Sequence, residues 1–221
     1  MYQEKIIQFA LKRKALQFGN FKLKSGRYSP YFFNSNRFYN GSDILALGEM
    51  YSDAIKNTKI NFDVIFGLAY KGIPITTAIA IVLKKKYNFN IPYFFNRKEK
   101  KTYSDSGNII GKTYTNKNII IIDDVITSGI TIQQSNTVIN FKNNNNNIVG
   151  IFVLFDRQEC SVSHTNTAKD ELIQKYCCPI FSIINIVNII KYLKKNNIYQ
   201  QHLKKMIEYY QKYGSSNINI I

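Results

Sequence analysis

Cysteine and histidine are scarce in this chain of 221 residues, which contains three cysteines and two histidines. Cys160, Cys177 and Cys178 form neither a C-x-x-C pair nor an even set, and adjacent cysteines rarely bridge each other. We therefore expect reduced, structural thiols. His164 and His202 lie far apart in the sequence without the spacing of metal ligands, so the sequence predicts no zinc site.

Long apolar segments are also missing. No run of about 18 or more apolar residues occurs. The nearest approach, Ile180 to Ile190, is interrupted by Ser182, Asn185 and Asn188. Charged residues recur every few positions in the opening stretch MYQEKIIQFALKRK, which is unlike a secretory signal. We therefore expect no membrane span and a cytoplasmic location.

Acidic residues are few, since 14 Asp and Glu stand against 30 Lys and Arg, giving a formal net charge of +16. Such an excess favours polyphosphate partners such as nucleic acid. Lys, Asn, Ile, Tyr and Phe are all abundant, however, and AT-rich codons encode all five. We favour codon bias as the source of the charge and expect no nucleic-acid partner.

The ends of the chain are predicted to be mostly helical. Apolar spacing predicts a first helix over residues 3–18 that stops at Gly19-Asn20. Short extended pieces follow on either side of the turn at residues 24–27, and a helix is expected over residues 44–56. Beyond Pro179 we expect one more strand and helices over residues 185–195 and 200–213.

The middle of the chain alternates short apolar runs with helix-like segments. Strands are predicted at residues 64–66, 91–95, 119–122 and 149–155, and helices at residues 73–85 and 132–141. This alternation predicts an α/β fold, with a mainly parallel sheet flanked by helices. Ligands of such folds bind at the carboxyl ends of the strands.

One segment of the chain carries most of the predicted chemistry. The buried-strand pattern Ile119 to Ile122 ends in the acidic pair Asp123-Asp124 and is followed by small residues from Thr127 to Thr131. Backbone N–H groups of small residues can surround a phosphate, and two carboxylates can accept hydrogen bonds from a sugar diol. A pentose 5-phosphate satisfies both requirements. The alternative interpretation is a strand with acidic caps and a helix-starting turn.

Two other phosphate-binding motifs can be tested directly. Residues 107–113 (GNIIGKT) have three residues between the glycines, whereas a Walker A loop has four and follows a strand. A G-x-G-x-x-G fingerprint is also absent, which disfavours a dinucleotide-binding dehydrogenase.

Residues 119–131 (IIIIDDVITSGIT) resemble the phosphoribosyl-diphosphate signature of type I phosphoribosyltransferases. Further blocks are similar to orotate phosphoribosyltransferases, in the same order: residues 24–33 (KSGRYSPYFF), 69–74 (AYKGIP), 96–99 (NRKE) and 156–159 (DRQE). A match of several ordered blocks is far more specific than any one motif. The resemblance implies a single phosphoribosyltransferase domain, with a core at about residues 42–180 and a small hood formed by about residues 1–41 and the C-terminal elements.

The implied reaction transfers the 5-phosphoribosyl group of phosphoribosyl diphosphate to orotate, giving orotidine 5′-phosphate and diphosphate in pyrimidine biosynthesis. The resemblance implies catalytic roles for Lys71, Lys98, Lys101, Asp123 and Asp124. The implied substrate contacts are these residues together with Lys24, Phe32, Phe33, Tyr70, Arg97, Tyr103, Val125, Ile126, Thr127, Ser128, Gly129, Ile130, Thr131 and Arg157. Phe32 and Phe33 would meet the orotate ring, with Thr127 and Arg157 at its polar edge. Mg²⁺ is expected to be held mainly by the substrate diphosphate.

Residues 98–107 form the polar, glycine-ended segment expected of a mobile lid. In the family this loop reaches the neighbouring subunit, so the resemblance implies a homodimer. Tyr103 stands where the family usually has histidine, and a phenol cannot carry positive charge near neutral pH.

Other interpretations of these residues and of the function remain open at this point. The lysines of the lid could form a solvated charge run, and Phe32-Phe33 could belong to the core. The rival functions are a phosphoribosyltransferase for a purine or for uracil, and a non-catalytic regulator that binds RNA.

Overall fold

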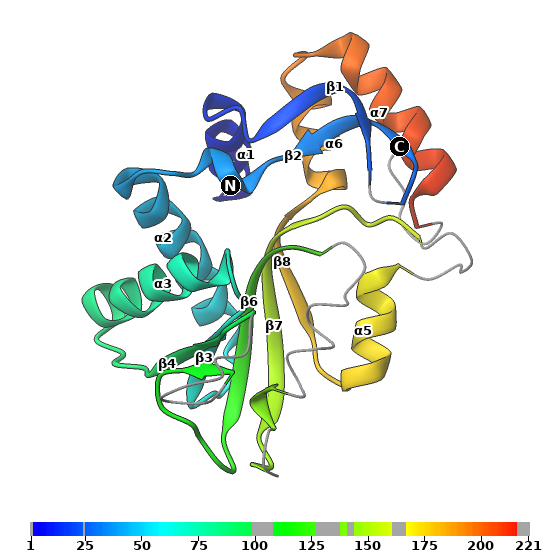
Figure 1. Cartoon of the computed structure of the whole chain (residues 1–221). Helices are drawn as coiled ribbons and strands as arrows, with labels where there is room; N and C mark the ends of the chain where they lie inside the picture. Colours follow the sequence, from blue (N-terminus) through cyan, green and yellow to red (C-terminus); the bar gives the residue numbers. More distant parts are fainter. Residues whose placement is uncertain are drawn as a thin grey trace.

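The structure is a computed structural model of the chain, and it describes residues 2–23, 25–98, 108–126, 138–140, 144–160 and 167–215. Figure 1 shows a twisted central sheet with helices on both faces and a second group of elements beyond one end of its strands. The described elements, in chain order, are α1 (Tyr2–Lys12), β1 (Leu16–Lys22), β2 (Tyr28–Phe33), the 3-10 turn η1 (Ser35–Arg37), α2 (Gly41–Thr58), β3 (Val64–Gly67), α3 (Gly72–Tyr87), β4 (Tyr93–Asn96), β5 (Ile109–Ile110), β6 (Asn118–Ile126), β7 (Asn147–Asp156), α5 (Ala168–Tyr176), β8 (Ile180–Asn185), α6 (Ile186–Lys195) and α7 (Gln200–Tyr213).

The central sheet has the strand order β5-β4-β3-β6-β7-β8. All neighbouring pairs are parallel except β4 and β5, which are antiparallel. The predicted α/β class with a mainly parallel sheet is therefore confirmed. β6 lies in the middle, so both of its edges are hydrogen-bonded, as its unbroken run of isoleucines predicted.

The four isoleucines of β6 divide between the two faces of the sheet. Ile120 and Ile122 pack in a cluster that includes side chains of α2 and α3, whereas Ile119 and Ile121 pack in a cluster that includes Leu172 of α5. Side chains of a strand alternate between faces, so one apolar run supplies both cores. In Figure 1, α2 and α3 cover one face and α5 covers the other.

A second group of elements, which we call the hood, comprises α1, the β1-β2 hairpin, α6 and α7. In Figure 1 these elements lie together beyond the end of the sheet where β6 and β7 finish. Asn185 starts α6 with a capping box, in which its side chain accepts from the Asn188 N–H (2.8 Å) and the Asn188 side chain accepts from the Asn185 N–H (3.0 Å). The short extended pieces predicted around the turn at residues 24–27 fall in this hairpin, and the two helices predicted near the C-terminus are present.

The predicted first helix is too long. α1 ends at Lys12, Lys14 has a positive φ of 54°, and residues 16–18 instead pair with residues 31–33 in the hairpin. Gly19-Asn20 lies inside β1, at an irregularity in the register, and does not terminate a helix. Strand pairing with β2 buries Leu16 to 4% exposure, a long-range contact that overrides local helical spacing.

Only residues 138–140 of the helix predicted over residues 132–141 lie within the described part of the chain. None of the helices in the described ranges is long and apolar enough to cross a membrane.

Candidate active site

Many of the described residues that were predicted for the site come from loops and strand ends at the carboxyl side of the sheet. Strands β4, β3, β6 and β7 are adjacent and parallel, so their carboxyl ends lie side by side. The residues at or just beyond these ends are Arg97 and Lys98 after β4, Tyr70 and Lys71 after β3, Asp123 to Ile126 in β6, and Arg157 after β7. The fold thus brings together residues that are far apart in the sequence, at the edge where parallel sheets bind ligands.

The acidic pair is held from two directions. The Ser35 hydroxyl donates to Oδ2 of Asp124 (2.5 Å), and the Tyr51 hydroxyl donates to the backbone carbonyl of Asp123 (2.7 Å). Along β6 itself, the backbone N–H of Asp124 donates to Oδ1 of Asp123, and that of Val125 donates to Oδ1 of Asp124, each at 2.9 Å. These bonds fix where both carboxylates lie.

The Asp123 carboxyl is strongly affected by its surroundings. Burial raises the pKa of Asp123 to about 7, and the neighbouring charge of Asp124 adds to this effect, whereas the charge of Lys98 opposes it. A carboxyl with such a pKa is only partly ionised at neutral pH, and nearby positive charge favours its ionised form. Burial also raises the pKa of Tyr51 well above its usual value, so its hydroxyl stays protonated and can donate.

Two glycines allow the loop after β3 to lie against the end of β6. A Cβ on Gly67 would lie 2.7 Å from Oγ1 of Thr76, and a Cβ on Gly72 would lie 2.5 Å from the carbonyl oxygen of Ile122. The backbone N–H of Leu68 donates to that same carbonyl (3.0 Å). The close approach places Tyr70 and Lys71 beside the strand that carries the acidic pair.

The loop after β4 lies next to the loop after β3. Oδ1 of Asn96 accepts from the backbone N–H of Ala69 (2.8 Å), and the Lys98 ammonium lies 4.9 Å from the centroid of the exposed Tyr70 ring. Nε of Arg97 is buried and has no hydrogen-bond partner among the residues that the structure describes. Leaving a buried donor unpaired is costly, and an anionic ligand would satisfy it.

Arg157 is buried, with 9% of its surface exposed. Its Nε donates to Oε1 of Glu159 (2.9 Å), and its Nη2 donates to Oε1 of Glu159 (2.5 Å) and to Oγ of Ser29 (2.9 Å). The guanidinium also lies over the Tyr31 ring, with Cζ 4.2 Å from the ring centroid. Its orientation is therefore set by several contacts.

Phe32 and Phe33 face opposite sides of the hairpin. Phe33 is 6% exposed and stacks on Phe155 of β7 with ring centroids 4.7 Å apart, whereas Phe32 is 37% exposed and stacks on Phe21 (5.5 Å). Adjacent strand residues cannot both point the same way. The side chain of Phe33 therefore belongs to the core, and only that of Phe32 is open to a ligand.

Several predicted site residues lie outside the described residues: Lys24, Lys101, Tyr103, Thr127, Ser128, Gly129, Ile130 and Thr131. Val125 and Ile126 are described and complete β6, with Ile126 buried at 5% exposure.

Ser35 and Tyr51 were missed by sequence reasoning, although both contact the acidic pair. Ser35 lies two positions after the block at residues 24–33, and this was the only signal available for it. Tyr51 lies on the buried, mostly apolar face of α2. Nothing in the sequence distinguishes its hydroxyl from that of any other core tyrosine.

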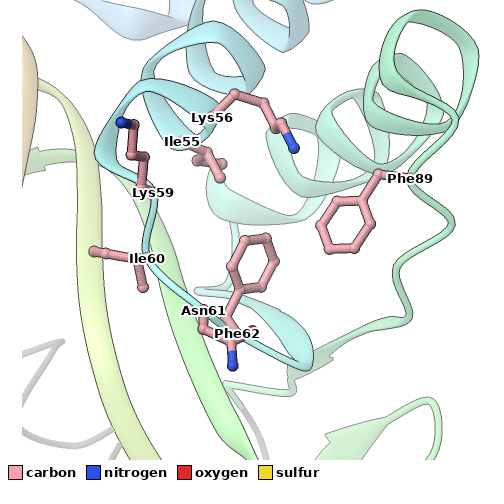
Figure 2. Close-up of a pocket in the computed structure, with 7 residues that line it drawn as sticks. All are labelled: Ile55, Lys56, Lys59, Ile60, Asn61, Phe62 and Phe89. Carbon is pink, nitrogen blue, oxygen red and sulfur yellow. The ribbon is translucent and has the colours of Figure 1, made fainter.

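A pocket of about 360 Å³ lies elsewhere, around the end of α2 and the entry to β3 (Figure 2). It is lined by Ile55, Lys56, Lys59, Ile60, Asn61, Phe62 and Phe89. Residues 60–62 precede β3, so this pocket is at the amino ends of the strands, opposite the predicted site.

Known proteins resemble the chain over nearly its whole length. A family model described as "Phosphoribosyl transferase domain" matches residues 36–192. An orotate phosphoribosyltransferase from Buchnera aphidicola subsp. Acyrthosiphon pisum is 45% identical over 213 residues, covering 96% of this chain and 99% of that protein. One from Actinobacillus pleuropneumoniae is 41% identical, covering 96% and 98%.

Among solved structures, the crystal structure of an orotate phosphoribosyltransferase from Francisella tularensis superposes with a TM-score of 0.84 at 38% identity, covering 96% of this chain and 100% of that one. The sequence identities and the structural superposition point to the same family as the ordered sequence blocks do. The chain belongs to the phosphoribosyltransferase family and, within it, to the orotate phosphoribosyltransferases.

Proposed function

We propose that the chain transfers the 5-phosphoribosyl group of phosphoribosyl diphosphate to orotate, giving orotidine 5′-phosphate and diphosphate on the route to UMP. Its family membership supports this reaction. The observation that carries the proposal is the position of Asp123-Asp124 in the strand order. Cationic residues follow β3 and β4 on one side of the pair, and Arg157 follows β7 on the other.

This strand order separates the two partners of a displacement reaction. The diphosphate would leave on the side of β3 and β4, and the base would approach from the side of β7 and the hood. A nucleophile and a leaving group on opposite faces of the ribose suit direct displacement at its anomeric carbon, so no covalent enzyme intermediate is needed. The acidic pair then lies under the ribose between them.

Asp123 and Asp124 would accept hydrogen bonds from the ribose diol and stabilise positive charge on the ring in the transition state. The pKa of about 7 for Asp123 in the unliganded protein falls when a cation-like centre forms above it, because positive charge favours the ionised carboxyl. Ser35 and Tyr51 would keep the pair in place while the charge develops.

The diphosphate would bind to Tyr70, Lys71, Arg97 and Lys98, together with Lys24, Lys101 and Tyr103. A leaving diphosphate gains negative charge, and each charge-assisted bond strengthens as it departs. The buried Nε of Arg97, which no described residue pairs, supports this role. Residues 125–131 would hold the 5-phosphate, before the helix that the sequence predicts over residues 132–141.

Orotate would stack against the exposed ring of Phe32, and its polar edge would meet Arg157 and Thr127. Phe33 would contribute its backbone, because its side chain is in the core. A planar guanidinium suits a carboxylate better than an ammonium does. This arrangement favours orotate over uracil, which lacks the carboxylate.

Mg²⁺ fits the donor chemistry of the acidic pair, since this ion prefers oxygen ligands and binds through one or two carboxylates plus substrate phosphates. No group of three or more His, Cys, Asp or Glu side chains suited to a metal occurs among the described residues. We propose that the ion arrives with the diphosphate and, when bound, neutralises part of its charge. We also propose a cytoplasmic homodimer, with Lys98, Lys101 and Tyr103 acting across subunits.

The decisive assay mixes the protein with phosphoribosyl diphosphate, Mg²⁺ and either orotate, uracil, adenine or hypoxanthine, and separates the products by chromatography. We expect orotidine 5′-phosphate from orotate and no product from the other bases. Product from uracil or a purine alone would identify a different phosphoribosyltransferase, and no product from any base would contradict the proposal and favour a non-catalytic regulator.

Variants sharpen this assay. Asp123→Asn with Asp124→Asn is expected to reduce kcat by at least about 100-fold, as for removal of electrostatic stabilisation in other enzymes. Asp53→Asn is the matched control, because Asp53 is an acidic residue of α2 that pairs with Lys86 at the surface (2.7 Å).

A further inference from the structure

Glu159 collects hydrogen bonds from both the core and the hood. Its Oε1 accepts from Nε and Nη2 of Arg157 and from the Tyr31 hydroxyl (3.2 Å), and its Oε2 accepts from the Tyr209 hydroxyl (3.3 Å). Nη1 of Arg27 lies 3.8 Å from Oε2. The Glu159 side chain is 13% exposed, so this carboxylate is mostly buried with its partners.

These contacts use a particular edge of the Arg157 guanidinium. Glu159 occupies Nε and one hydrogen of Nη2, and Ser29 Oγ accepts from Nη2 as well (2.9 Å). The Tyr31 ring lies against the face of the group. Nη1 makes none of the hydrogen bonds to Glu159 and Ser29. A ligand would therefore meet Arg157 through Nη1.

The same carboxylate connects Arg157 to the strand that carries Phe32. Tyr31 belongs to β2 and Tyr209 to α7, so Glu159 joins the end of β7 to two elements of the hood. Burial raises the pKa of Tyr31 well above its usual value and that of Tyr209 to about 12. Both hydroxyls therefore remain donors at physiological pH.

We propose that Glu159 is a positioning residue for recognition of the base: it holds the Nε–Nη2 edge of Arg157 so that Nη1 faces the orotate carboxylate. This inference rests on the proposed function, in which Arg157 contacts orotate. Glu159 would touch no substrate itself. It would act by fixing the plane and the edge of the guanidinium relative to Phe32, so its effect should be confined to the base.

The first test compares Glu159→Gln with the wild type in steady-state kinetics. Glutamine keeps the size of the side chain but loses the charge that orders the guanidinium. We expect KM for orotate to rise by about tenfold, the scale of a weakened charged hydrogen bond. The Kd of phosphoribosyl diphosphate, measured by calorimetry, should stay within about twofold. Unchanged orotate kinetics, or equal losses for both substrates, would overturn the proposal.

Two further variants separate positioning from general support of the fold. Tyr209→Phe removes a hydroxyl that bonds to Glu159 and also interacts with Arg157, but it leaves the Glu159–Arg157 pair in place, so KM for orotate should rise less than in Glu159→Gln. Ser29→Ala removes the other acceptor of Nη2 and should raise KM for orotate by about threefold. If Glu159→Gln fails to fold, Ser29→Ala decides the matter, and unchanged orotate kinetics there would contradict the inference.

A double-mutant cycle tests whether Glu159 acts through Arg157. Once Arg157→Ala has removed the guanidinium, adding Glu159→Gln should change kcat/KM for orotate by less than about twofold. Additive losses would overturn the inference. Failure of the proposed function looks different, because then the wild type itself forms no orotidine 5′-phosphate, or Arg157→Ala leaves KM for orotate unchanged.

Discussion

The Ser35 hydroxyl donates a 2.5 Å hydrogen bond to the Asp124 carboxylate, across 89 positions of sequence. Ser35 begins the short turn that follows β2, and Asp124 lies near the end of β6. The bond therefore connects the segment just after the strand that carries Phe32 to the carboxylates proposed to lie under the ribose. It would fix the proposed base site relative to the proposed ribose site.

Ser35→Ala should weaken substrate binding more than it weakens the fold. Asp124 loses a donor to its charged oxygen, a bond worth about 1.5–3 kcal/mol, so we expect KM for phosphoribosyl diphosphate to rise about tenfold or more. The melting temperature should fall only slightly. Ser42→Ala, at an exposed position in the first turn of α2, is the control and should behave as the wild type. An unchanged KM in Ser35→Ala would show that this bond does not position Asp124.

The raised pKa of Asp123 predicts a pH-dependent cost to folding. Burial first, and then the charge of Asp124, raise this pKa to about 7, whereas the unfolded carboxyl titrates near about 4. Between these values the native state binds a proton that the unfolded state lacks. The contribution of Asp123 to the free energy of unfolding therefore falls as the pH rises from about 4 to about 7, and it is constant above that.

Asp123→Asn removes this cost, so the variant should gain melting temperature over the wild type as the pH rises from about 5 to about 8. Circular dichroism melts without ligands measure the difference directly. Asp53→Asn controls for the change from carboxylate to amide. A gap between variant and wild type that does not grow with pH would contradict the raised pKa.

Gly72→Ala should disturb the loop that presents Tyr70 and Lys71. The added methyl would lie 2.5 Å from the Ile122 carbonyl oxygen, so the start of α3 must move away from β6. We expect a loss of about 1–3 kcal/mol in stability, as for overpacking elsewhere, and weaker binding of phosphoribosyl diphosphate by calorimetry. Gly41→Ala is the matched control, because nothing lies within 4 Å of a Cβ there. Equal behaviour of the two variants would refute the steric argument.

Phe33→Ala should mainly reduce the stability of the fold, whereas Phe32→Ala should mainly weaken the binding of orotate. Truncating the buried Phe33 leaves a cavity against Phe155 and should cost about 3–5 kcal/mol in urea denaturation. Truncating Phe32 should cost far less stability but should raise KM for orotate, because its exposed ring is proposed to stack on the base. If Phe32→Ala binds orotate normally, this ring does not contact the base.

Tyr103→His changes a residue of the segment expected to act as a lid, which lies outside the described part of the chain. A protonated imidazole can stabilise a departing diphosphate, whereas a phenol can only donate a neutral hydrogen bond. We expect the variant to accelerate the chemical step in single-turnover kinetics with little effect on diphosphate binding. An unchanged single-turnover rate would show that position 103 does not contribute to departure.

The sequence alone predicted the sheet and the acidic pair, because both depend on short-range patterns. A run of β-branched residues buried on both faces indicates an inner strand, and the carboxylates that follow the run lie toward the carboxyl end of that strand, although β6 continues beyond them to Ile126. The ordered blocks of residues added the family, which the comparisons confirm.

The prediction of a helix over residues 3–18 was wrong in its second half, because the structure there depends on a long-range contact. Its second half has helical spacing, yet its side chains find better burial by pairing with β2, a contact that no local window contains. Likewise, only the pairing of β1 with β2 decides that Phe33 is core while Phe32 is open, since either residue could have faced inwards.

What the sequence determined by itself was therefore the fold class, the family, and the placing of the acidic pair and of Arg157 at the carboxyl ends of strands. What only the tertiary structure decided was which groups hold them: Ser35 and Tyr51 on the acidic pair, and Glu159 on Arg157. Serine and tyrosine hydroxyls look alike wherever they occur in a sequence. Their partners are set by the crossing of strands and helices in space, because a hydrogen bond depends on distance and direction and not on separation along the chain.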